Sequence, residues 1–134
     1  MLGTIVLAIF LTLMGSFPVL AADEISGQIQ GFNCLVAGTK CPSDNMDPHL
    51  MLESDFVLLL ANSDYYLLPN LSRAVKAKYL GKNVKVTGKT NDKYRAIMVE
   101  VLKVEARNDF KTVWSAKMMR EEMMRRLVEF YPEH

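Results

Sequence analysis

NVKVTGKTNDKYRAIMVEVLKV, residues 83–104, is the stretch that most clearly predicts the fold, because it contains two strands joined by a tight turn. Val84 and Val86 alternate with polar residues, which is typical of a strand with one buried face. The Asn–Asp pair that follows favours a turn. In the second strand the apolar residues begin on one face and end on the opposite face. This shift predicts a β-bulge or a change of environment near Val101.

Upstream of this hairpin, the chain carries the pattern of three further strands and one helix. The strand signals lie at residues 24–36, in the continuous apolar run 56–61 and in the short segment 65–68. A proline ends the third strand. Residues 71–80 then repeat apolar side chains at helical spacing, with Asn70 as the expected N-cap and Gly81 as the C′ glycine.

This order of three strands, one helix and two strands resembles the OB-fold, a five-stranded Greek-key barrel with a helix between its third and fourth strands. More narrowly, residues 24–105 resemble small exported bacterial proteins that join a signal peptide to one such barrel. The residues that carry the resemblance are Gly27, residues 56–60, Tyr65, Tyr66 and residues 84–88. We therefore expect a mainly β chain with helices: a five-stranded OB-like Greek-key barrel (β-β-β-α-β-β) plus a C-terminal α-helix.

The expected organisation has three parts. Residues 1–22 form a signal peptide, residues 23–107 form the barrel with a cysteine-containing loop insertion at residues 34–55, and residues 108–134 form a C-terminal helical extension. Two glycines in the first strand, at positions 27 and 31, mark a bend, a bulge or a close backbone approach. The expected core consists of Ile25, Ile29, Val57, Leu59, Val75, Val84, Val86, Ile97 and Val99.

The first 22 residues contain no Asp, Glu, Lys, Arg or His, and begin with an apolar run at residues 2–14. Ala21 and Ala22 are small enough for a signal-peptidase site. The pattern predicts a bacterial secretory signal cleaved near these alanines, and hence a periplasmic or secreted protein that meets the membrane only during export. The alternative is an uncleaved anchor, because about 20 apolar residues can span a bilayer.

Cys34 and Cys41 are the chain's two cysteines, and they lie in a segment with loop composition. In an oxidising compartment this spacing predicts a structural disulfide that contributes about 2–3 kcal/mol of stability. A thiol–disulfide redox role is less favoured, because the pair lacks the Cys-x-x-Cys spacing at a helix N-terminus.

A copper or zinc site is the other alternative for this loop, because sulfur, imidazole and carboxylate donors lie close together in sequence. The candidate ligands are Cys34, Cys41, Asp44, Asp47 and His49, with Glu53 and Asp55 nearby. The first two aspartates stand beside prolines and suit turns equally well.

Charge and motif content disfavour nucleic-acid binding and catalysis. The 16 Lys and Arg nearly balance the 15 Asp and Glu, so the net charge of +1 gives no strong attraction to nucleic acids or anionic membranes. Tyr65 and Tyr66 are candidates for base stacking, but adjacent strand residues face opposite sides of a sheet. No Ser–His–Asp or Cys–His arrangement is visible, so we predict no catalytic residue and, metal apart, no cofactor.

Residues 110–130 combine helical charge pairing with a wide apolar face. Glu121 and Glu122 stand four residues before Arg125 and Arg126, which supports an exposed helical surface. The apolar face predicts either a helix that covers one end of the barrel or a methionine-rich surface for an envelope protein or a second copy. The candidate partner-binding residues are Trp114, Met119, Met123, Met124 and Phe130.

The sequence therefore favours an exported, non-enzymatic OB-fold module that contacts a small ligand or an envelope protein. The alternative is a periplasmic copper- or zinc-binding protein that uses residues 34–55. A thiol–disulfide redox protein is a further alternative with less support.

Overall fold

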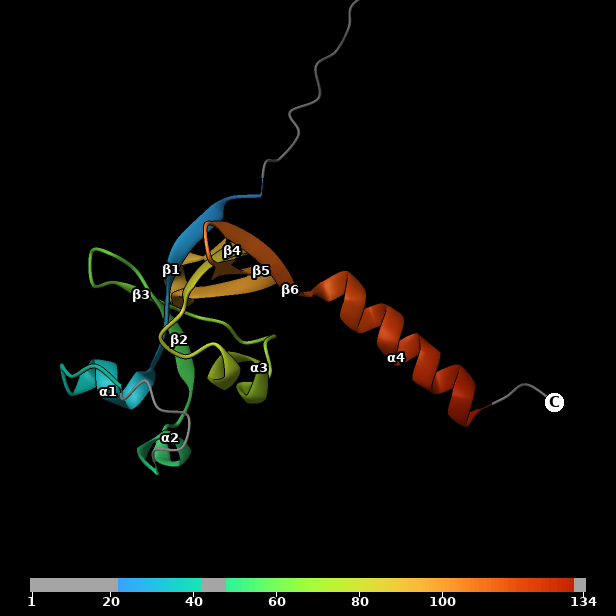
Figure 1. The fold of residues 1–134 in the computed structure, drawn as a ribbon, viewed down its shortest axis with the longest axis horizontal. Helices are drawn as coiled ribbons and strands as arrows, with labels where there is room; N and C mark the ends of the chain where they lie inside the picture. Colours follow the sequence, from blue (N-terminus) through green and yellow to red (C-terminus); the bar gives the residue numbers. More distant parts are fainter. Residues whose placement is uncertain (1–21, 42–47, 132–134) are drawn as a thin grey trace, which may run out of the picture.

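Five strands of alternating or continuous apolar residues close into one barrel in the computed structural model, which describes residues 22–41 and 48–131 (Figure 1). The predicted leader, apart from Ala22, lies outside the described residues. The barrel strands are β1 (Glu24–Gly31), β2 (Phe56–Leu59), β3 (Tyr65–Leu67), β4 (Asn83–Asn91) and β5 (Ala96–Ala106).

The pairing of these strands is that of an OB-like Greek-key barrel. Strand β1 pairs antiparallel with both β2 and β4, while β2–β3 and β4–β5 are antiparallel hairpins. Leu67 of β3 lies parallel to Ala96 of β5 and closes the barrel. The backbone N–H of Leu67 donates to the carbonyl of Arg95 at 2.7 Å. With helix α3 (Arg73–Lys78) between β3 and β4, the predicted fold class is confirmed.

Of the two explanations for the change of face in β5, the structure shows the β-bulge, one residue before Val101. Thr87 pairs with Val101 but Gly88 pairs with Val99, so Glu100 is the additional residue in β5. A Cβ at position 88 would collide with the backbone carbonyl of Met98, so the close approach of the two strands here requires glycine.

The core occupies the barrel interior. Six of the nine predicted core residues are buried: Ile29, Val57, Val84, Val86, Ile97 and Val99. Ile25 and Val75 are half-buried because they pack against the edge of this cluster. In β2 the fully buried leucine is Leu58, whereas the predicted Leu59 is half-buried.

Several predicted element boundaries are wrong, among them the end of the first strand and the start of α3. The first strand ends at Gly31, and residues 32–36, predicted as strand, form the short helix α1 (Phe32–Val36). The N-cap of α3 is Ser72, whose hydroxyl accepts from the N–H of Val75 at 3.3 Å. Asn70 instead bonds through its amide to both backbone groups of Val99, at 2.7 and 2.9 Å, and so joins the turn before α3 to β5.

The C-terminal helix begins later than predicted. Residues 109–115 form strand β6 (Asp109–Ser115), which pairs with β5, and helix α4 (Ala116–Phe130) follows. Arg107 adopts the left-handed conformation (φ 62°) that turns the chain back into this hairpin. Trp114 is therefore a β6 residue and is only 8% exposed, packed in the core cluster. It does not belong to an exposed helical face.

Two further helical turns complete the described chain: α2 (His49–Leu52), within the predicted loop insertion, and the 3-10 turn η1 (Asp92–Tyr94). None of the helices in the described ranges is long and apolar enough to cross a membrane.

Candidate functional site

Cys34 and Cys41 form the predicted disulfide, with a Cα–Cα distance of 5.5 Å. Cys34 lies in α1, and Cys41 lies in the segment that follows this helix. The bridge confirms the structural expectation and is compatible with an oxidising, extracytoplasmic compartment.

A buried carboxylate lies against this disulfide. The side chain of Glu53 is only 6% exposed, and its Oε1 lies 2.9 Å from Sγ of Cys34 and 3.4 Å from Sγ of Cys41. Its oxygens also accept from the backbone N–H groups of Asn33 at 2.7 Å and Cys34 at 3.1 Å. Because Gly31 has no side chain to cap α1, Glu53 satisfies the second and third N–H groups of this helix, and the first, that of Phe32, donates to the carbonyl of Asp55 at 2.9 Å.

Two other residues allow Glu53 to occupy this position. The guanidinium of Arg73 donates to the backbone carbonyls of Leu50 at 2.8 Å and Glu53 at 2.9 Å, and so holds the end of α2. A Cβ at Gly31 would collide with the carboxyl group of Glu53 and with Sγ of Cys41. Gly31, for which the sequence left a bend, a bulge or a close backbone approach open, therefore leaves space for the side chains of the cluster.

The structure brings together only part of the predicted ligand set. The two sulfurs and one oxygen of Glu53 lie within 4.8 Å of one another. Asp44 and Asp47 lie outside the described residues, as does the side chain of His49, whose backbone begins α2. We refer below to Cys34, Cys41 and Glu53 as the cysteine–carboxylate cluster.

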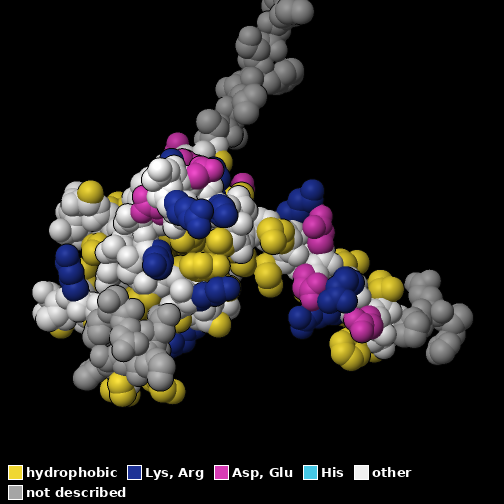
Figure 2. Space-filling view, viewed as in Figure 1, with side chains coloured by type: hydrophobic (Ala, Val, Ile, Leu, Met, Phe, Trp, Pro, Cys, Tyr) yellow, Lys and Arg dark blue, Asp and Glu magenta, His cyan; other side chains and the backbone are white. Residues whose placement is uncertain are grey.

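Helix α4 is the second candidate site. It projects away from the barrel in Figure 1, and none of its residues is buried. Hydrophobic side chains nevertheless lie along it beside the charged ones (Figure 2). The large apolar side chains of this helix that are more than 45% exposed are Met118, Met119, Met123, Met124, Leu127, Val128 and Phe130.

Four of these side chains form a stripe at helical spacing. Met119, Met123, Leu127 and Phe130 follow one another at intervals of four, four and three residues, which places them on one face. Together with Tyr131 they line an open groove bordered by charged side chains, among them Arg120 and Arg126. We call these four residues the α4 stripe.

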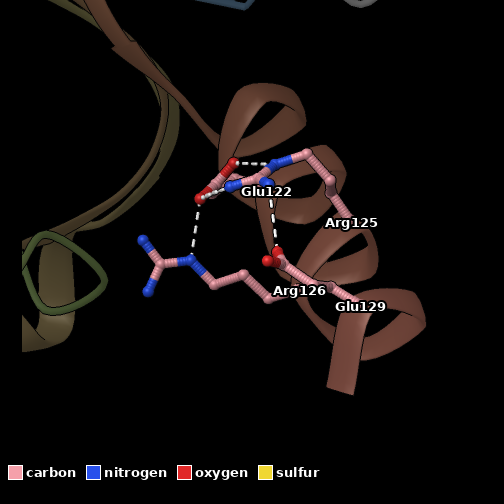
Figure 3. A network of polar contacts seen from close by, with 4 residues as sticks. All are labelled: Glu122, Arg125, Arg126 and Glu129. Atoms are coloured by element: carbon pink, nitrogen blue, oxygen red, sulfur yellow. Dashed lines mark hydrogen bonds and ion pairs between the residues drawn. The ribbon is translucent and has the colours of Figure 1, made fainter. Parts of the chain in front are cut away.

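One flank of the α4 stripe carries a network of charged contacts (Figure 3), and two of its members, Glu122 and Arg126, also border the groove. Arg125 donates two hydrogen bonds to Glu122, at 2.8 and 2.9 Å, and one to Glu129 at 3.3 Å. Arg126 donates through Nε to Glu122 at 2.7 Å, and its two terminal nitrogens point away from the other three residues (Figure 3). Hydrogen bonds from Arg125 and Arg126 lower the pKa of Glu122 to about 2.

The two tyrosines considered for base stacking are engaged within the barrel wall. Tyr65 packs edge-on against Phe32, with ring centroids 5.8 Å apart, and the guanidinium of Arg95 lies 5.6 Å from its ring centre. Tyr66 packs against the core and donates to Asp92 at 3.2 Å, a hydrogen bond that raises the pKa of its hydroxyl. A carboxylate beside this surface opposes contact with phosphates.

Comparison with protein-family models, with curated proteins and with solved structures found no match for this chain.

Proposed function

We propose that this chain is an exported, non-enzymatic OB-fold accessory module that binds an envelope protein through α4. The observation that carries the proposal is the exposure of the α4 stripe. Soluble proteins rarely leave a continuous apolar strip in water unless another surface covers it. Here the stripe lies on a projecting helix with no buried residue, so the barrel does not cover it.

Helix α4 also has the form of a helix that docks in a groove. Such helices present apolar anchors at spacings of three, four and seven residues, and the α4 stripe follows this spacing. A helix of 15 residues is marginally stable in water without tertiary contacts. Two local features support the helix in the absence of a partner. Ser115 caps it by accepting from the N–H of Met118 at 3.1 Å, and Arg126 donates to Glu122 at 2.7 Å.

The charges beside the stripe indicate the chemistry of the partner. Arg120 and Arg126 stand on opposite sides of the stripe, since they lie about 120° apart on the helix. The described part of the chain contains no ion-pair partner for Arg120, and Arg126 has unused terminal nitrogens. We therefore expect an apolar groove with carboxylates along both rims, which would exclude basic partners and orient the helix.

The rest of the molecule is consistent with this role. The disulfide suits the oxidising compartment expected from the leader. Such a module would be similar to the small exported single-barrel proteins that the sequence resembles. It would differ from a minimal five-stranded barrel by the additional elements β6 and α4.

A comparison of two methionines tests the proposal. Met123 lies in the α4 stripe, while Met118 lies about 140° away on the charged side, and they are 56% and 51% exposed. We would cross-link tagged protein in the periplasm, identify the captured protein and measure its affinity after purification. Met123→Glu should weaken this affinity at least tenfold, because a charge would enter an apolar groove, whereas Met118→Glu should not change it.

Three outcomes would reject an envelope protein as the occupant. Equal affinity of both variants would show that the stripe is not the contact. Light scattering that detects a dimer of wild type and Met118→Glu, but not of Met123→Glu, would identify a second copy as the occupant. Binding to anionic vesicles with the same dependence on Met123 would identify a lipid surface.

A further inference from the structure

We propose that the cysteine–carboxylate cluster binds one Zn²⁺ ion when its disulfide is reduced, with Sγ of Cys34, Sγ of Cys41 and a carboxylate oxygen of Glu53 as ligands. The three donor atoms lie within 4.8 Å of one another. Zinc binds sulfur at about 2.3 Å and carboxylate oxygen at about 2.0 Å, so small rotations of the freed side chains bring all three donors to one ion.

The position of Glu53 is the main evidence for this site. A buried carboxylate is normally paired with a cation or coordinates a metal. Glu53 is only 6% exposed, yet no Lys or Arg within residues 22–41 and 48–131 forms an ion pair with its side chain. The nearby Arg73 donates to the backbone carbonyl of Glu53 and not to its carboxylate.

In the oxidised cluster the carboxylate of Glu53 accepts hydrogen bonds from two backbone N–H groups, and the disulfide sulfurs donate none to it. One oxygen of Glu53 lies 2.9 and 3.4 Å from sulfurs that carry no proton in the disulfide. In the reduced state the same oxygen faces two thiols or two metal-bound thiolates. Two backbone N–H groups already fix the orientation of Glu53, which is the role that outer hydrogen bonds play for carboxylate ligands.

The donor set favours Zn²⁺ over copper(I). Thiolates bind both ions, but copper(I) gains little from a hard carboxylate, whereas zinc accepts sulfur and carboxylate together. Two thiolates and one carboxylate leave one position of a tetrahedral ion for water or a further ligand.

Zinc binding and the disulfide exclude each other. A dithiol reductant supplies two electrons and two protons to Cys34–Cys41, which becomes two thiols while the reductant becomes a disulfide. Zn²⁺ then replaces the two thiol protons as the zinc–sulfur bonds form. Metal binding would therefore report the redox state of the compartment and does not depend on the role proposed for α4.

A zinc titration with the full chain tests the site. Reduced protein should bind one Zn²⁺ per chain by competition with a chromophoric chelator, and oxidised protein should bind none. Glu53→Gln should weaken the affinity at least tenfold, while Glu121→Gln, on the distant α4, should leave it unchanged. X-ray absorption at the zinc edge should find two sulfur neighbours at about 2.3 Å and oxygen at about 2.0 Å in the wild type.

Several results would overturn the inference. Reduced wild type that binds no Zn²⁺ would exclude the site. Wild-type affinity in Glu53→Gln would exclude Glu53 as a ligand. Loss of the circular-dichroism signal in Glu53→Gln would show that Glu53 acts through folding.

Discussion

Gly31 determines how closely Glu53 can approach the two cysteines. Any Cβ there would collide with the Glu53 carboxyl group and the Cys41 sulfur, and both groups are fixed, by hydrogen bonds and by the disulfide. Relief of this collision would require the buried carboxylate or the bridge to move. At the scale of single residues, one missing side chain therefore makes the cysteine–carboxylate cluster sterically feasible.

We expect Gly31→Ala to lower the free energy of unfolding by about 1–3 kcal/mol, because the added methyl group overpacks the space beside Glu53 and Cys41. Urea denaturation measures this difference in the free energy of unfolding, provided that the m-value is the same for the variant and the wild type. The control is the same substitution in a Cys34→Ala, Cys41→Ala, Glu53→Ala background, where the colliding atoms are absent and the cost should fall by about 1 kcal/mol or more. An equal loss of unfolding free energy in both backgrounds would mean that the destabilisation does not come from a collision with this cluster.

At the scale of the element, α4 depends on its own side chains for stability. Glu122 receives hydrogen bonds from both Arg125 and Arg126, which hold its pKa at about 2 in place of the usual 4.5. Because the folded pKa is lowered, the carboxylate form stabilises the helix fully above about pH 4.5. This contribution is lost as the pH falls through 2.

A carbon-detected NMR titration of the Glu122 carboxyl group should give a midpoint near 2 in the wild type. Replacement of both arginines in Arg125→Gln, Arg126→Gln should raise this midpoint toward 4.5, because the hydrogen bonds that favour the charged form are gone. High salt should raise it less, since hydrogen-bonded contact pairs are screened only in part. A wild-type midpoint near 4.5 would mean that the network does not persist in solution.

The elements also show what sequence patterns can predict. An irregularity in β5 was predictable because its apolar residues change face within one strand, but this pattern fits a change of environment as well as a β-bulge. Strand β6 was not predictable, because the spacing of Phe110, Val113 and Trp114 suits a helix as well as a strand. The hairpin depends on the left-handed conformation of Arg107, and arginine is not a signal for such a turn.

The candidate site was predictable only in part for a similar reason. Compartment and spacing were enough to predict the disulfide. The contact of Glu53 with both sulfurs depends on tertiary structure, since Arg73 of α3 holds the end of α2 and Gly31 of β1 leaves the space. Sequence distance placed Glu53 among the nearby donors but could not show that its carboxylate is buried.

At the scale of the whole molecule, the barrel and the projecting helix are energetically separate. Strand β6 belongs to the barrel, because Trp114 is packed in the core and pairs with Leu102 of β5. Ala116 is the α4 residue that packs against this core. Everything beyond it in the described chain contributes exposed surface, and therefore little to the stability of the barrel.

A chain that ends after Lys117 should consequently keep the melting temperature of the full protein to within about 2 °C, and its radius of gyration in small-angle scattering should fall as the projection is lost. A chain that ends after Arg107 also loses Trp114 and should lose about 3–5 kcal/mol, the usual cost of removing a large buried aromatic side chain. If the first truncation instead lowered the melting temperature by as much as the second, α4 would have to pack on the barrel in solution. The α4 stripe would then be covered by the protein's own surface, and the proposed partner site would not exist.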